Sequence, residues 1–163
     1  MIYITIFLFL LSIMLEGIIP SLFKDIMPLF IIVMIIISST FNIENKYLYI
    51  IIFLSGIIYD LLYTSTIFLN GFIFIFIYYI SKMLIDNNIN YIKAIFYYYI
   101  LSILYIIIMF YFTYFYIPKS IMYILNLYIK SIIINTLYFT FLYTIFIGIK
   151  NIISNRNKKH SYF

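Results

Sequence analysis

Long apolar stretches separated by short polar segments constrain this chain more than any other feature. Residues 2–19 hold one charged side chain, Glu16, and residues 47–63 hold one, Asp60. Soluble domains carry roughly 25% charged residues. Here the charged share is 9%, and 67% of the residues are hydrophobic, with a mean hydropathy of +1.16. The chain has too little polar surface to cover a globule in water, so we expect an integral membrane protein.

Polar segments and prolines divide the chain into candidate helices. A spanning helix needs about 20 apolar residues, and 163 residues accommodate six such helices with short loops. The start of the last helix is ambiguous, because residues 131–149 suffice to span and residues 121–130 would then form an interfacial helical turn. The predicted fold is an all-α bundle of six transmembrane helices, with five plus an interfacial or re-entrant segment as the alternative. The first five are expected at residues 2–19 (ending at Pro20), 26–41, 47–63, 67–85 and 93–117.

The basic residues predict the orientation of these helices. Cytoplasmic loops of membrane proteins carry an excess of Lys and Arg. With six helices and both termini in the cytoplasm, seven of the ten basic residues lie inside and Lys24, Lys119 and Lys130 lie outside. We therefore expect a transmembrane domain at residues 1–150, a basic cytoplasmic tail at residues 151–163, and both termini inside.

The composition argues against several functional classes. With no cysteine, the chain has no disulfide, no thiolate metal site and no cysteine nucleophile. The only histidine, His160, lies in the basic tail, and neither a Gly-rich phosphate loop nor a His–carboxylate metal spacing is present. We expect no enzymatic activity, no metal or other cofactor, and no nucleic-acid partner.

The acids inside predicted spans are the candidate site residues. An ionisable group at the centre of a membrane helix costs on the order of 3 kcal/mol on insertion scales, and such groups are candidates for function. From the helical rise, Glu16 lies about 20 Å from the inner end of its helix, Asp60 about 20 Å and Asn135 about 22 Å. We therefore expect these three side chains to share one level in the outer half of the membrane, with Lys130 near the outer rim above them.

The expected role of this polar cluster remains open between three readings. The side chains could form structural hydrogen bonds between helices, bind a partner helix, or handle a ligand or ion. Gly56 lies four residues before Asp60, hence on the same helical face, where a small residue lets another backbone approach closely. That spacing favours a packing face around Asp60.

The segment Gly56-Ile57-Ile58-Tyr59-Asp60-Leu61-Leu62-Tyr63, followed by Gly71, resembles the signature of the rod-shape-determining MreD family. In that family a G-x-x-x-D-L-L segment ends the third helix and a glycine-containing turn opens the fourth. Leu15-Glu16 before a proline, and Asn135 followed by Leu137, are also similar. The chain has Asn70-Gly71 where the family has Leu-Gly.

The resemblance implies a non-enzymatic, multi-pass component of the bacterial inner membrane that belongs to the cell-elongation machinery. Its implied role is to help couple cytoskeletal filaments to peptidoglycan synthesis. The implied partners are the bitopic protein MreC, the glycosyltransferase RodA with its class B transpeptidase, and the actin-like MreB. The resemblance places Gly56, Asp60 and Gly71 in the motif.

A different class of membrane protein is the alternative. Substrate-binding S components of energy-coupling-factor vitamin transporters are also small six-helix proteins, and the MreD fold is thought similar to theirs. They dock on their transport partner through small residues, typically alanines along the first helix. Here Ala94 is the only alanine in the chain, which favours the scaffold. An unrelated small membrane scaffold is the third possibility.

Overall fold

The computed structural model describes residues 2–41, 47–64, 66–85, 90–113 and 120–160, without the side chains of 153–160. The prediction of an all-helical chain with six helices is confirmed, because these are the elements that the described residues form. The helices are α1 (Ile2–Leu22), α2 (Phe30–Thr40), α3 (Leu48–Tyr63), α4 (Leu69–Leu84), α5 (Tyr91–Thr113) and α6 (Ile121–His160).

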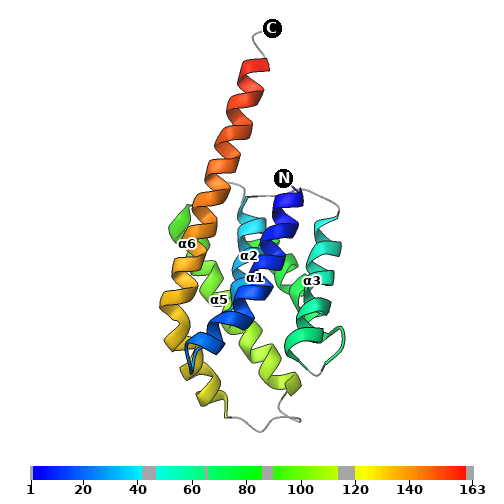
Figure 1. Ribbon diagram of the computed structural model, residues 1–163, viewed down its shortest axis with the longest axis vertical. Helices are drawn as coiled ribbons and strands as arrows, with labels where there is room; N and C mark the ends of the chain where they lie inside the picture. Colours follow the sequence, from blue (N-terminus) through cyan, green and yellow to red (C-terminus); the bar gives the residue numbers. More distant parts are fainter. Residues whose placement is uncertain (1, 42–46, 65, 86–89, 114–119, 161–163) are drawn as a thin grey trace.

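The helices run alternately up and down in a bundle (Figure 1). As a result α1 begins and α6 ends at the same end of the bundle, and the C-terminal part of α6 projects beyond it. A 40-residue helix is about 60 Å long, twice the hydrocarbon thickness of about 30 Å.

The short helix α2 forms the centre of the bundle. It packs against α1, α4, α5 and α6, and all eleven of its residues are buried. This matches a segment that is hydrophobic all round, which must be buried on every face. By contrast, the buried residues of α3 recur at helical spacing and leave the other face exposed; they are Leu48, Ile52, Ser55, Gly56 and Asp60.

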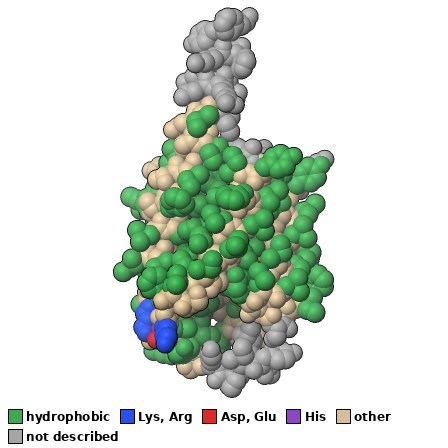
Figure 2. All heavy atoms as spheres, in the orientation of Figure 1, with side chains coloured by type: hydrophobic (Ala, Val, Ile, Leu, Met, Phe, Trp, Pro, Cys, Tyr) green, Lys and Arg blue, Asp and Glu red, His purple; other side chains and the backbone are tan. Residues whose placement is uncertain are grey.

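Three helices are long and apolar enough to cross a membrane, and they lie at Ile2–Leu22, Tyr91–Phe112 and Ile121–Ile152. The other three have 11, 16 and 16 residues. At about 1.5 Å per residue, α2 is only about 16 Å long. The outward surface agrees with a membrane environment, because the visible face is almost wholly hydrophobic and the visible charged side chains gather at one end (Figure 2).

Three predicted boundaries are wrong. Helix α1 does not stop at Pro20 but continues to Leu22, because a proline in the last turn removes only one intrahelical bond and the Phe23 N–H still bonds the Ile19 carbonyl oxygen at 2.9 Å. Helix α2 begins at Phe30 rather than at residue 26. Helix α6 begins at Ile121 and continues without a break, so residues 121–130 are its first turns and not a separate interfacial segment.

Candidate functional site

Helix α2 begins inside the bundle, and side chains from other helices complete its N-terminus. The first residue before the helix, Leu29, offers no side-chain cap. Instead the Glu16 carboxylate Oε2 on α1 accepts the Ile31 N–H at 3.0 Å. The Asn135 amide Oδ1 on α6 accepts the Leu29 N–H at 3.1 Å. Both polar side chains are thus bonded to the backbone of one helix start.

A side chain of another helix also bonds the backbone of the segment that precedes α2. Ser131 lies one turn before Asn135 on α6, and its hydroxyl Oγ accepts the Met27 N–H at 2.5 Å. The segment from 26 to 29 has no regular structure of its own, so its backbone donors need partners from outside. Between them, Glu16, Ser131 and Asn135 supply acceptors for the N–H groups of residues 27, 29 and 31.

The unpaired N–H groups at the start of α2 explain why an acidic residue lies beside it. The first N–H groups of a helix have no intrahelical partners, and an unsatisfied backbone group in an apolar surrounding costs several kcal/mol. The carboxyl Oε2 of Glu16, which is 8% exposed, supplies such a partner to the Ile31 N–H of α2.

Helix α4 repeats this arrangement with Asp60. Phe68, the residue before the helix, makes no side-chain cap. The Asp60 carboxylate on α3 accepts the Asn70 N–H through Oδ2 at 2.9 Å and the Asn70 side-chain Nδ2–H through Oδ1 at 2.6 Å. Its Oδ1 also accepts the hydroxyls of Thr64 at 2.7 Å and Thr66 at 3.1 Å. Asp60 therefore ties the end of α3, the turn and the start of α4 together.

The turn that these bonds hold is strained at one residue. Phe68 has φ 66°, in the left-handed region that non-glycine residues rarely adopt. Such a conformation costs on the order of 1–3 kcal/mol and persists only where its surroundings enforce it. Two features stabilise this conformation of Phe68. Asp60 bonds residues on both sides of Phe68, and the Phe68 ring stacks on the Phe53 ring at a centroid distance of 6.4 Å.

Gly56 and Gly71 meet where α3 crosses the start of α4. A Cβ atom added at Gly56 would lie 2.7 Å from the carbonyl carbon of Asn70 and would also clash with the Gly71 backbone. A Cβ at Gly71 would lie 3.0 Å from the Phe53 ring. The two glycines therefore allow the close approach that brings the Asp60 carboxylate to the Asn70 amide.

Two tyrosines, Tyr59 and Tyr105, lie between the two acids. The Tyr105 hydroxyl on α5 donates to the Asn70 side-chain Oδ1 at 2.9 Å. The Tyr59 side chain on α3 lies near both Tyr105 and the Glu16 side chain. Hydrogen bonds therefore link Tyr105 through Asn70 to Asp60, and Tyr59 lies between Tyr105 and Glu16.

The structure brings some of the candidate residues together and separates others. Glu16 and Asn135 meet at the start of α2, whereas Asp60 lies at the start of α4 with Gly56 and Gly71 beside it. Lys130 is exposed on α6, outside both groups. The Asn135 Nδ2 is buried and has no hydrogen-bond partner among the residues that the structure describes.

Sequence reasoning missed six members of these groups, which are Tyr59, Thr64, Thr66, Asn70, Tyr105 and Ser131. Asn70 carries a usable signal, because an amide inside an apolar segment directly after a turn is a candidate for hydrogen bonding to a nearby acid. The tyrosines carry no such signal, because the chain has 20 of them. The contacts across α3 and α5 alone identify which tyrosines matter.

The chemistry available to the site follows from these partners. Both carboxylates accept backbone N–H groups, so they act first as helix caps supplied by a neighbouring helix. Among the residues described, no group of three or more His, Cys, Asp or Glu side chains could hold a metal ion. Comparison with protein-family models, with curated proteins and with solved structures finds no match to this chain.

Proposed function

We propose that this protein is a non-enzymatic membrane scaffold of the MreD type, located in the bacterial inner membrane. In this role it helps couple cytoskeletal filaments to peptidoglycan synthesis through an MreC-like bitopic protein. The wider assembly contains RodA with its class B transpeptidase and extends to MreB. The chain crosses the membrane six times with both termini in the cytoplasm.

One observation carries the proposal. Of the residues that make the resemblance to the MreD signature, Gly56 lies against the Gly71 backbone, and Asp60 accepts the N–H of Asn70, the residue before Gly71. A glycine contact and an acid that caps the next helix form one structural unit. This contact supports treating the three residues as one motif, as the resemblance does.

The arrangement at α2 favours a scaffold over the transporter component. In many transporters, the N-terminus of an interrupted helix binds an anionic group of the substrate. In this chain the Glu16 carboxylate occupies that position on α2, with its Oε2 3.0 Å from the Ile31 nitrogen. The start of α2 is therefore satisfied by the protein itself.

Affinity purification from the native membrane in mild detergent, with mass spectrometry of the co-eluting proteins, tests the proposal. We expect a single-pass coiled-coil protein together with the enzymes of wall synthesis. Recovery of paired ATPases with a larger membrane subunit would establish the transporter component instead. Asp60→Leu should reduce recovery of the partners, whereas Leu62→Ala, at a neighbouring residue that is 59% exposed, should not.

A further inference from the structure

Two tyrosine hydroxyls are buried between α5 and α6 without a protein partner. In the part of the chain that the structure describes, the buried side-chain atoms that make no hydrogen bond are the Tyr98 hydroxyl on α5, the Tyr128 hydroxyl on α6 and the Asn135 Nδ2. Tyr98 is 0% exposed and Tyr128 is 4% exposed, so neither hydroxyl reaches water outside the bundle. Because an unpaired hydroxyl in an apolar surrounding is costly, each of the two needs an internal partner.

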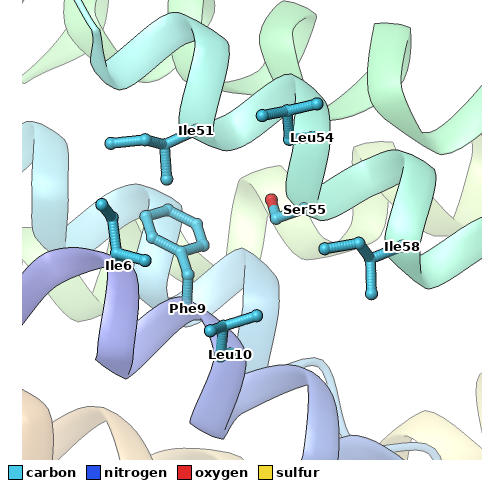
Figure 3. A pocket seen from close by; sticks show the side chains of 7 residues that line it. All are labelled: Ile6, Phe9, Leu10, Ile51, Leu54, Ser55 and Ile58. Carbon is cyan, nitrogen blue, oxygen red and sulfur yellow. The ribbon is translucent and has the colours of Figure 1, made fainter.

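Other buried hydroxyls of this protein show how such groups are satisfied. Ser55, in the outward groove between α1 and α3 (Figure 3), donates to the Ile52 carbonyl oxygen of its own helix at 2.7 Å. Tyr105 donates to the Asn70 Oδ1 of another helix at 2.9 Å. A serine can bond the preceding turn, whereas the ring of a tyrosine carries the hydroxyl too far from its own backbone. The partner of a buried tyrosine hydroxyl must therefore come from across an interface.

A third hydroxyl lies with the two tyrosines. Tyr98 and Tyr128 lie near each other, and both lie near Ser102 on α5, which is 0% exposed. The Ser102 hydroxyl donates to the Tyr98 carbonyl oxygen at 2.8 Å, so its hydrogen is used while its oxygen can still accept. The group therefore offers two O–H donors and one acceptor that are not bonded to one another.

The donors and the acceptor of this group match one water molecule. Polar groups that lie near one another without a direct bond are commonly bridged by water, and a buried water typically makes about three hydrogen bonds. A water here accepts from the Tyr98 and Tyr128 hydroxyls and donates to the Ser102 Oγ. All three groups are then satisfied.

Other occupants fit this group less well. None of the three side chains is charged, so they offer no counter-charge to an anion, and three hydroxyls are too few ligands for a hard cation. A larger ligand would need an opening, yet the most exposed of the three, Tyr128, is 4% exposed. The site therefore suits a single small neutral molecule.

The two helices already meet through polar side chains. Hydroxyl pairs join them elsewhere, and they are Tyr91 with Thr140 and Tyr99 with Thr136. We propose that an ordered water molecule bridges the hydroxyls of Tyr98, Tyr128 and Ser102 as a fixed part of the interface between α5 and α6, independently of the function proposed above.

Radiolytic footprinting tests this site. The full-length protein in nanodiscs is exposed to short X-ray pulses that generate hydroxyl radicals from water, and oxidised residues are mapped by mass spectrometry. Because these radicals react close to where they form, a buried tyrosine beside an ordered water is oxidised. We expect Tyr98 and Tyr128 to be oxidised several-fold faster than Tyr105, which is 2% exposed and has its hydroxyl bonded to the protein.

A variant and its control complete the test. Tyr128→Phe removes one donor to the water and should lower the oxidation of Tyr98 to the level of Tyr105. Tyr79→Phe, at a residue that is 55% exposed on α4, should leave the oxidation of Tyr98 unchanged.

Two results would overturn the proposal. One is oxidation of Tyr98 and Tyr128 no faster than that of Tyr105, which would mean a dry interface. The other is fast oxidation of Tyr98 that Tyr128→Phe does not change, which would mean transient opening to outside water. If Tyr128→Phe does not fold, Ser102→Ala removes the acceptor and must give the same loss of oxidation at Tyr98.

Discussion

The carboxylate of Asp60 near the end of α3 accepts the backbone N–H of Asn70 near the start of α4 at 2.9 Å. Glu16 does the same from α1 for Ile31 in α2, at 3.0 Å. In both cases an acid on one helix caps the helix that follows it in the chain. The two acids inside the apolar segments therefore have a physical reason to be there, before any partner is considered.

Replacing Asp60 should destabilise the protein in proportion to the bonds lost. Asp60→Asn keeps an acceptor for the Thr64 and Thr66 hydroxyls, but its N–H₂ group faces the Asn70 backbone N–H. We expect the free energy of unfolding to fall by about 1 kcal/mol. Asp60→Leu leaves several buried donors without a partner, and we expect a loss of about 3 kcal/mol or more. Thermal unfolding in mild detergent, followed by circular dichroism, measures both.

The control for this series is Leu61→Ala, next to Asp60 but 72% exposed. It should unfold within about 0.5 kcal/mol of the wild type, as surface substitutions usually do. Equal stability of Asp60→Leu and Leu61→Ala would contradict the capping role of Asp60.

Alanine substitutions at two glycines, one in the α3–α4 contact and one outside it, should have opposite effects on stability. Gly56→Ala forces a Cβ atom against the backbone of α4, and overpacking of this kind costs about 2–3 kcal/mol. Gly148→Ala on α6 meets no atom within 4 Å, so it should stabilise the helix by up to about 1 kcal/mol. The same unfolding assay should give opposite signs for the two variants. A neutral Gly56→Ala would mean that α3 and α4 do not approach as closely as described.

The tyrosine link predicts that distant substitutions interact. Tyr105→Phe removes the bond to the Asn70 Oδ1 and should cost about 1 kcal/mol in the wild type. In an Asp60→Asn background, where the Asn70 backbone N–H has lost its acceptor, the same change should cost about 0.5 kcal/mol less, as expected for residues of one network. A double-mutant cycle of unfolding free energies measures this difference. Strict additivity would show that Tyr105 and Asp60 act separately.

The proposed topology can be checked because the chain contains no cysteine. Single cysteines at Tyr3 (84% exposed) and Ile152 (60% exposed) should react with an impermeant maleimide only from the cytoplasmic side. Cysteines at Phe23 (57% exposed) and Met122 (75% exposed) should react only from the opposite side. Labelling of Met122→Cys and Ile152→Cys from one side would contradict six crossings.

Apolar patterning was sufficient to predict the helices, because stretches of this composition leave few alternatives in a membrane. The start of α2, which was predicted too early, depends on tertiary contacts. Residues 26–29 are apolar enough to be helical, yet the N–H groups of Met27 and Leu29 bond Ser131 and Asn135, more than 100 residues away. No local pattern reports such partners.

The candidate site was predictable as a set of residues and not as an arrangement. An equal depth for Glu16, Asp60 and Asn135 follows from the helical rise, but depth does not say which helix start each side chain meets. That depends on the rotation of each helix about its axis, which packing determines. The place of Asn70 between Asp60 and Tyr105 depends on the left-handed turn at Phe68, and a phenylalanine gives no sign of it.

Hydrogen exchange at the amides of Ile31 and Asn70 tests the capping of α2 and α4 most directly. The first amides of a helix normally lack intrahelical partners and exchange readily, whereas here the two acids should protect them. With the protein in nanodiscs, we predict that Asp60→Leu accelerates exchange mainly at Asn70, and Glu16→Leu mainly at Ile31. Unchanged exchange at both amides in both variants would contradict the account.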